Sequence, residues 1–341
     1  MENNKNSKIF YGWWVVLGCV LITTTMVPPI MSLSNKFLIQ VSMMVTNWFV
    51  EKRGIAMSVT MAGIGLGGTI FSPIVTNLLQ NYGWRHTYLI MAGIILVVAL
   101  PVALFVLKKS PEQMGLKAYG AEKQAANNAK QGTKKQGVLI SVKESKTKLF
   151  FLLMIVGMLA NGIINSGALG QFPPALEELH GASVQAAIIS LYSLVGIFGK
   201  IFIGWINDKF GVVVSATYGC IMFGLAFVFM LLGQNTNMLY IMAVVFGFGN
   251  AIGTVIPPLV TSEVFGMEKY PEAYGMVNSA TQVGLSLGSL LVASMYDLNG
   301  SYTLAWMLLL VLTAVTLFSW VGSCIVAKRY MASDVELKQA Q

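Results

Sequence analysis

The stretch GWINDKFG, residues 204–211, decides the fold class of this chain. A long apolar run ends there, Asp208 and Lys209 follow, Gly211 closes the turn, and another long apolar run begins at once. The spacing Gly204-x-x-x-Asp208-Lys209-x-Gly211 predicts a short charged turn between two apolar helices. The pattern occurs once in the chain.

The composition assigns those helices to a membrane. The chain has 341 residues, of which 55% are hydrophobic and 11% are charged, and its mean hydropathy is +0.69. Soluble domains carry about a quarter charged residues, which excludes a water-soluble fold. Many apolar runs reach the roughly 20 residues that a crossing helix needs. The alternating segments of about 10 residues that are typical of a porin-like barrel are missing from the sequence. We therefore predict an all-α membrane protein.

Nine apolar runs are long enough to cross a bilayer: 11–33, 55–79, 87–107, 149–173, 183–206, 212–233, 238–262, 273–296 and 303–327. The run VSMMVTNWFV (41–50) is too short to cross and is predicted to be a fragment of a span. Segment 108–147 is rich in Lys, Gln and Asn, and it has too little apolar surface to pack. We therefore expect a truncated N-terminal bundle (1–107), a basic flexible linker (108–147) and a complete six-helix bundle with a short tail (148–341).

The basic residues orient the chain. Lys5 and Lys8 precede the first span, lysines fill the linker, and Lys328 and Arg329 follow the last span. The positive-inside rule assigns all three regions, and therefore both termini, to the cytoplasm. The turns expected outside in the second half hold no Lys or Arg; they are 176–182, 233–237 and 297–300. We expect a multi-pass protein of the plasma membrane, with the lipid bilayer as a partner.

Two segments, one from each half, share glycines at the same offsets. In EKRGIAMSVTMAGIGLGG (51–68) and EAYGMVNSATQVGLSLGS (272–289), Gly54, Gly63 and Gly67 match Gly275, Gly284 and Gly288. With the central linker, this similarity indicates two parallel repeats. Gly63, Gly67, Gly284 and Gly288 are interpreted as sites of close helix packing. GIGLGG (63–68) lies in mid-span, without the strand and the acid that a dinucleotide site needs.

The sequence contains no arrangement typical of an enzyme. Cys19, Cys220 and Cys324 lie inside apolar runs without metal-ligand spacing, and His86 and His180 have no nucleophile or metal ligand in sight. We expect no catalytic site, no metal, no cofactor and no nucleic-acid partner.

The sequence resembles the major facilitator superfamily. GWINDKFG is similar to the turn that joins the second and third helices of each six-helix half in that family. Basic residues follow the last glycine in the complete signature, whereas Val212 and Val213 stand here. FYGWWVV (10–16) and NWFVEKRGIAMSVTMAGIGLGG (47–68) resemble the oxalate/formate antiporter group, which includes monocarboxylate transporters.

The resemblance implies twelve helices, and in that register helices 2, 3 and most of 4 are missing between about Gln40 and Val41. The first-half copy of GWINDKFG, which belongs between helices 2 and 3, does not occur. Phe37–Val50 must also return the chain across the membrane, but at about 1.5 Å per residue it spans only ~21 Å of a ~30 Å core. We predict that the chain is an internally shortened form of a longer transporter.

Lys200 is the strongest candidate for a substrate-binding residue. It precedes Asp208 by about two helical turns, which places it roughly 12 Å inside the span. A charge at that depth usually faces a cavity or a partner, here an anionic carboxylate. The alternative is a lysine whose long stem reaches the headgroups. The oxalate/formate group typically carries a cation at this place. Its second cation, in helix 11, is replaced here by Thr281 or Gln282, which favours a monocarboxylate over oxalate.

Other polar residues inside the spans allow two interpretations. They could hydrogen-bond a substrate, but bonding between helices is favoured for any single one of them; they are Asn161, Asn165, Gln171, Asn250, Asn278 and Gln282. Of these, Asn165, Asn250 and Gln282 join Lys200 and Thr281 in the predicted site. Prolines predicted to kink helices are Pro28, Pro29, Pro73, Pro257 and Pro258. In the family, the aspartate at Asp208 would latch the cytoplasmic side, whereas the alternative is an ordinary charged turn.

These observations favour a secondary active transporter of small organic anions, such as the monocarboxylates lactate or formate, that works by alternating access. Coupling to protons and exchange against a counter-anion both stay open, since the spans hold no Asp or Glu as an obvious proton carrier. The alternative is a non-transporting or defective remnant of such a transporter, because the binding site should lie between two complete halves.

Overall fold

The computed structural model describes residues 10–26, 34–108, 110–121, 137–138 and 140–331. Lys5, Lys8, Pro28, Pro29, the end of the predicted span 11–33, the middle of the linker and the C-terminal tail lie outside these residues. The chain divides into two compact units, Met1–Lys130 and Gln131–Gln341. The boundary between them falls within the segment predicted to be a linker.

The described residues are almost entirely helical. In chain order the elements are α1 (Tyr11–Met26), α2 (Ser34–Trp48), α3 (Arg53–Pro101), η1 (Val102–Val106), η2 (Pro111–Met114), α5 (Val142–Ser145), α6 (Leu149–Phe210), α7 (Val212–Leu231), α8 (Thr236–Gly249), η3 (Asn250–Gly253), α9 (Ile256–Asn299), α10 (Thr303–Ala327) and η4 (Lys328–Tyr330). Among the described residues, six segments are long and apolar enough to span a membrane: Asn81–Val106, Leu149–Phe210, Val212–Leu231, Thr236–Gly266, Glu268–Asn299 and Thr303–Tyr330. The predicted all-α membrane fold is confirmed.

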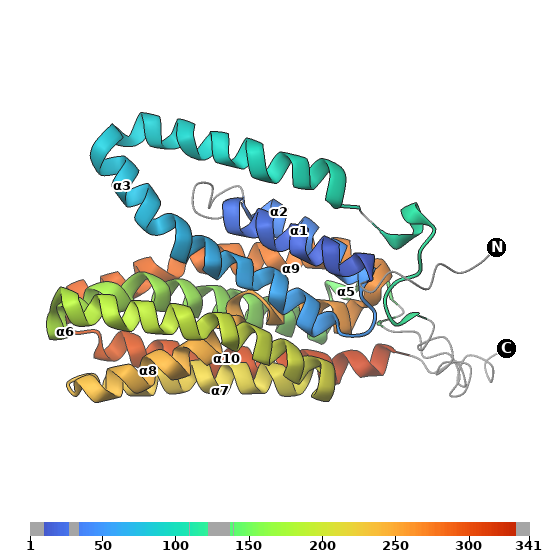
Figure 1. The fold of residues 1–341 in the computed structure, drawn as a ribbon. Coiled ribbons are helices and arrows are strands. Elements are labelled where there is room, and N and C mark those ends of the chain that lie inside the picture. Colours follow the sequence, from blue (N-terminus) through green and yellow to red (C-terminus); the bar gives the residue numbers. More distant parts are fainter. Residues whose placement is uncertain (1–9, 27–33, 109, 122–136, 139, 332–341) are drawn as a thin grey trace. The chain divides into compact units, whose positions relative to one another are not determined.

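Single glycines reverse the chain between helices. Gly83 in α3, Gly181 in α6, Gly266 in α9 and Gly211 between α6 and α7 all combine φ of 68–87° with ψ of 169–175°. This region of the backbone map is essentially restricted to glycine. Each helix therefore folds into two arms at one residue, as Figure 1 shows for α3 and α6.

In the first unit, α1 packs closely along the first arm of α3. The hydroxyl of Thr24 donates a hydrogen bond of 3.1 Å to the carbonyl of Gly63. One turn later, a side chain at Gly67 would collide with the carbonyl oxygen of Thr24. Both glycines thus lie where the α1 and α3 backbones meet.

The second helix is longer than the fragment expected at 41–50, since α2 begins at Ser34. The C-terminal end of α2 forms hydrogen bonds with the first part of the predicted linker. The amide of Tyr119 donates to the carbonyl of Trp48 (2.8 Å), and the indole Nε1 of Trp48 donates to the carbonyl of Lys108 (2.8 Å). Phe49 and Tyr119 also form an isolated parallel bridge. Residues 108 and 119 are therefore bound to the helical part of the first unit.

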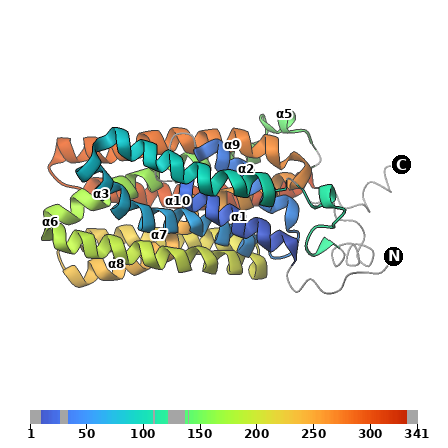
Figure 2. The same cartoon turned by 45° about the horizontal axis from the view of Figure 1, so that its top comes forward.

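In the second unit, α6 is the central element and packs against α8, α9 and α10. These helices run alongside one another in Figures 1 and 2. Aromatic side chains fill the interior: Phe172 lies 5.0 Å from Phe246 and 5.3 Å from Trp306 between ring centroids. All three are buried, so this cluster ties α6, α8 and α10 together.

The tightest crossing in this unit joins the first arm of α6 to the second arm of α9. A side chain at Gly284 would meet the carbonyl oxygen of Leu159, and one at Gly288 would meet that of Ile163. From the other helix, a side chain at Gly162 would meet the carbonyl oxygen of Thr281. Only glycine allows the two backbones to approach so closely.

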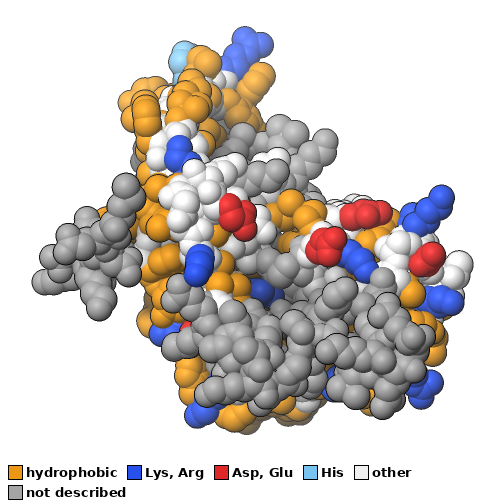
Figure 3. All heavy atoms as spheres, turned by 90° about the vertical axis from the view of Figure 1, so that its right-hand side faces the viewer, with side chains coloured by type: hydrophobic (Ala, Val, Ile, Leu, Met, Phe, Trp, Pro, Cys, Tyr) orange, Lys and Arg blue, Asp and Glu red, His pale blue; other side chains and the backbone are white. Residues whose placement is uncertain are grey.

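The two ends of the second unit differ in charge. The Gly211 end, which also holds the start of α6, Gly266 and the end of α10, carries Lys148, Lys209, Lys269, Lys328 and Arg329 together with Asp208, Glu263, Glu268 and Glu272. The Gly181 end, formed by 171–185, 230–240 and 294–306, carries Glu177, Glu178 and Asp297 and no Lys or Arg in these described ranges. Figure 3 views the chain from the side on which α10 ends, and Lys, Arg, Asp and Glu side chains stand out on that face.

The end of the predicted linker is fastened to the bend of α9 at Gly266. The amide of Val138 donates to the carbonyl of Val264 (2.9 Å). The ammonium of Lys269 donates to the carbonyls of Val138 (2.7 Å) and Ile140 (2.9 Å). Residues 138 and 140 therefore form part of the second unit rather than a free tether.

Candidate functional site

The candidate site surrounds a break in the middle of one span. The apolar segment Thr236–Gly266 contains α8, the 3-10 turn η3 and the first arm of α9, which has Pro257 and Pro258 near its first turn. Proline has no N–H, so the carbonyls of Gly253 and Thr254 lose the donors of a regular α-helix. In a membrane, such a break is tolerated only where protein buries it or where it lines a cavity. At the prolines predicted to kink the span, the structure has a short 3-10 turn between two α-helical segments.

The second arm of α6 brings Lys200 next to this break. Lys200 is only 6% exposed, and among the described residues it is the one charged side chain that is buried. Its neighbour Gly199 lies against α8, since a side chain there would come within 2.7 Å of the Cα of Phe248. One turn earlier, the Cβ position of Gly196 faces the side-chain Nδ2 of Asn250 at 3.6 Å.

The first arm of α6 reaches the same break from its other end. Asn165 is 5% exposed and packs so closely on Gly253 that a side chain at that glycine would collide with its Oδ1. The Nδ2 of Asn165 donates to the backbone carbonyl (2.8 Å) and to Oδ1 (2.9 Å) of Asn161. η3 therefore lies between a lysine-bearing arm and an asparagine-bearing arm of one helix.

The remaining predicted site residues lie on the second arm of α9. Thr281 is buried at the crossing with α6, and its Oγ1 has no hydrogen-bond partner within the chain. Gln282 is half-buried beside it. Gln171 instead joins helices, since its Nε2 donates to the hydroxyl of Ser289 (2.9 Å) and its Oε1 accepts from Tyr302 (3.4 Å).

The charged turn at 204–211 has a defined local structure. The amide of Gly211 donates to the carbonyl of Asn207 (2.9 Å). The ammonium of Lys209 lies 5.0 Å from the ring centroid of Trp205 and 5.2 Å from that of Phe210, within the range of cation–π attraction. The side chain of Asp208 is exposed, and it also interacts with another group of the chain. The rings thus hold the lysine against its own helix.

Two features of this site were not anticipated from the sequence. Gly196 and Gly199, which bring α6 onto α8 and η3, were not singled out, although the spacing of small residues in GIFGK is the signal for such a contact. The pairing of Asn165 with Gly253 joins residues far apart in the chain, and no local pattern could indicate it.

Solved structures with a similar fold are membrane transporters. The human organic anion transporter MFSD10 (TETRAN) matches with a TM-score of 0.61 at 14% sequence identity, covering 91% of this chain and 82% of that one. FucP, a Major Facilitator Superfamily transporter in the outward conformation, matches with a TM-score of 0.56 at 14% identity, covering 93% and 84%. At these identities the likeness concerns the fold alone.

Sequence relatives carry transporter names. Monocarboxylate transporter 12-B of Danio rerio is 26% identical over 293 residues, which cover 78% of this chain and 59% of that relative. Monocarboxylate transporter 12 of Rattus norvegicus is 25% identical over 291 residues (78% and 58%). The uncharacterized MFS-type transporter YhjX of Escherichia coli (strain K12) is 27% identical over 246 residues (71% and 56%). The chain thus spans less than two thirds of the length of these relatives.

The family assignment rests on most of the chain. The sequence model described as Major Facilitator Superfamily matches residues 30–187 and 150–333. The two matches overlap, and together they cover residues 30–333, which hold every described helix after α1. With its helical fold and its membrane-spanning segments, the chain belongs to the Major Facilitator Superfamily.

Proposed function

We propose that this chain is a secondary active transporter of small organic monocarboxylates, such as lactate or formate, that works by alternating access. The observation that carries the proposal is the burial of Lys200 beside a broken span. A charged side chain buried inside a membrane span usually marks a substrate or ion pathway, and a carboxylate is the substrate group that matches the charge of a lysine. The names of the relatives, several of which are monocarboxylate transporters, support this substrate class.

Polar side chains around η3 and on the second arm of α9 suit such a substrate. Lys200 would form the charge-assisted bond to the carboxylate, and the amides of Asn250 and Asn165 would contribute hydrogen bonds near η3. The unpartnered hydroxyl of Thr281, or Gln282, would bind the rest of the substrate in place of a second cation. One cation for one carboxylate favours a monocarboxylate over oxalate. The proposed mechanism needs no metal, cofactor or catalytic side chain.

The finer assignments belong to the same proposal. We assign the chain to the oxalate/formate antiporter group within the superfamily and to the plasma membrane. The Gly211 end, which carries Lys and Arg, would face the cytoplasm, and the Gly181 end, which carries none in its described ranges, would face the outside, in keeping with the positive-inside rule. Asp208 and Lys209 would then latch the cytoplasmic side. Proton symport and anion exchange are both compatible with the site.

We also propose that the first bundle is shortened. The 15 residues of α2 extend about 22 Å, less than the ~30 Å of a bilayer core. Helices 2, 3 and most of 4 of the family pattern would be the missing part. The alternative that follows is a remnant that is inserted in the membrane but completes no transport cycle.

Uptake of labelled lactate, formate and oxalate into proteoliposomes tests the proposal. We expect uptake of the two monocarboxylates, reduced at least tenfold by Lys200→Gln and partly restored by Lys200→Arg. Lys146→Gln is the matched control, because it removes an exposed lysine just before the same helix that has no role in the proposed site or latch. Uptake that survives Lys200→Gln would refute the site. A folded protein without any uptake would favour the remnant.

A further inference from the structure

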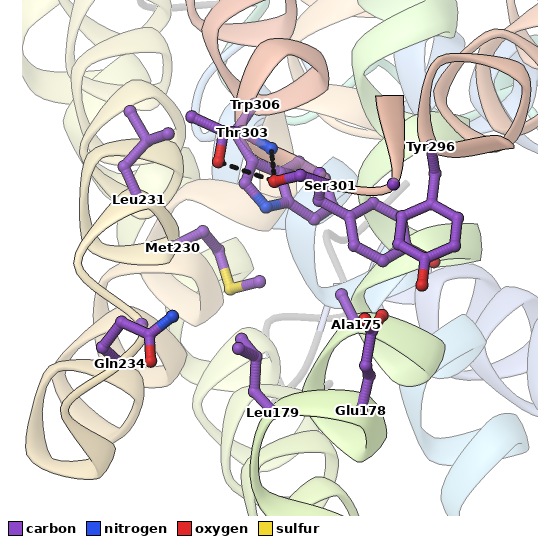
Figure 4. A pocket seen from close by; sticks show the side chains of 13 residues that line it. Ala175, Glu178, Leu179, Met230, Leu231, Gln234, Tyr296, Ser301, Thr303 and Trp306 are labelled. Atoms are coloured by element: carbon purple, nitrogen blue, oxygen red, sulfur yellow. Dashed lines mark hydrogen bonds between the residues drawn. The ribbon is translucent and has the colours of Figure 1, made fainter. Parts of the chain in front are cut away.

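A cavity of about 260 Å³ opens at the Gly181 end of the second unit. Figure 4 shows side chains from α6, α7, α9 and α10 around it, with Glu178, Gln234 and Ser301 contributing polar groups and Leu179 and Met230 apolar ones. The volume lies just below the range of about 300–1,000 Å³ that is typical of ligand pockets. It therefore suits a ligand of only a few heavy atoms.

The walls of this cavity create a negative potential. Three helix arms end there, namely the first arm of α6, α7 and the second arm of α9, and α10 begins there at Thr303. The C-terminal ends of helices carry a partial negative charge, and the partial positive charge at the start of α10 offsets one of the three. Glu178 adds a full negative charge, and the lining residues include no Lys or Arg. Burial raises the pKa of Tyr302 above its ordinary value, and the nearby Glu178, Tyr296 and Asp297 raise it further.

The cavity is held open by a rigid frame. Tyr302 stacks on Tyr296 with ring centroids 4.3 Å apart and on Trp306 at 5.3 Å. The Nε2 of His180 donates to the carbonyl of the lining residue Gly233 (2.7 Å). A preformed site loses little conformational entropy on binding.

We propose that this cavity binds a small organic ammonium ion. The ammonium group lies beside the carboxylate of Glu178, and its short alkyl part lies over Met230, Leu179 and the buried Trp306. A divalent metal is a poorer occupant, because no group of three or more His, Cys, Asp or Glu that could hold one occurs in the described part of the chain. This site is distinct from Lys200 and does not depend on whether the chain transports carboxylates.

Isothermal titration calorimetry of the full-length chain in uncharged detergent tests the proposal, with n-propylammonium as the probe. Propionate, of the same length and opposite charge, is the ligand control. Glu178→Gln removes the charge from the cavity, whereas Glu177→Gln removes an adjacent charge that is also exposed but does not line the cavity. Loss of one charge-assisted contact weakens binding roughly 10- to 100-fold.

We expect propylammonium to bind with a Kd that rises at least tenfold in Glu178→Gln and less than twofold in Glu177→Gln. Thermal unfolding of both variants verifies that they are folded. Three results would overturn the proposal: no binding of propylammonium, equal weakening by both variants, or displacement of bound propylammonium by the same concentration of sodium ions. Binding of propionate that also depends on Glu178 would contradict it as well.

Discussion

A methyl group added at Gly284 probes the crossing of α6 and α9 in the second unit. Its Cβ would meet the carbonyl oxygen of Leu159 and lie 2.9 Å from both the Cα of Gly162 and the amide nitrogen of Ile163. All three are backbone atoms, so no side chain can rotate away and the helices must separate. Overpacking of this kind costs about 1–3 kcal/mol.

Gly275→Ala is the matched control. Gly275 belongs to the same arm of α9, but a Cβ there would find no atom within 4 Å. Replacing glycine by alanine in a helix favours folding by up to ~1 kcal/mol, and this gain is common to both variants. It therefore cancels in the comparison, which leaves the steric cost at Gly284. We expect Gly284→Ala to be less stable than Gly275→Ala by about 1–3 kcal/mol.

Thermal unfolding followed by a thiol-reactive fluorogenic dye measures this difference. The free cysteines Cys220 and Cys324 are 2% and 5% exposed, so they react with the dye only when the second unit opens. The expected cost corresponds to a melting temperature lower by roughly 2–10 °C in Gly284→Ala than in Gly275→Ala. Equal melting temperatures, or a higher one for Gly284→Ala, would refute the close crossing.

Three further variants test other parts of the structure. Lys269→Met removes two hydrogen bonds to the backbone before α5, so trypsin should cleave at residues 143–148 faster than in the unchanged chain. An unchanged cleavage rate would argue that these two hydrogen bonds do not hold the segment. Gly211→Ala places a side chain at φ 87° and ψ 171°, which should cost ~1–3 kcal/mol and lower the melting temperature in the dye assay. Trp48→Phe removes the indole bond to residue 108 and should destabilise the first unit by about 1–2 kcal/mol in denaturant titration, whereas no change would mean that water replaces this bond.

The course of the chain through the membrane could be read largely from local patterns. The turn at Gly211 was predicted, and Gly83, Gly181 and Gly266 all lie between predicted spans. What could not be read is that one glycine makes each reversal, with the helix resuming at the next residue. The reversal depends on the backbone angles that the glycine adopts, and the presence of a glycine allows these angles without requiring them.

The candidate site was predictable in part. Lys200 stands out because a charge inside an apolar run is visible in the sequence alone. Its surroundings are not, since Asn165 and Gly253 are brought together by the packing of α6 on η3. The linker illustrates the same difference: its composition predicted a free tether, but the carbonyl of Val138 accepts a hydrogen bond from Lys269 on a distant helix.

The sequence by itself determined that the chain is a helical membrane protein with a charged turn at 204–211, because partition between water and lipid depends on the composition of each run. Only the tertiary structure decided which glycines touch another backbone, that η3 interrupts a span beside Lys200, and that three helix ends enclose an acidic cavity. Those features depend on distances between residues far apart in the chain, which sequence periodicity does not encode.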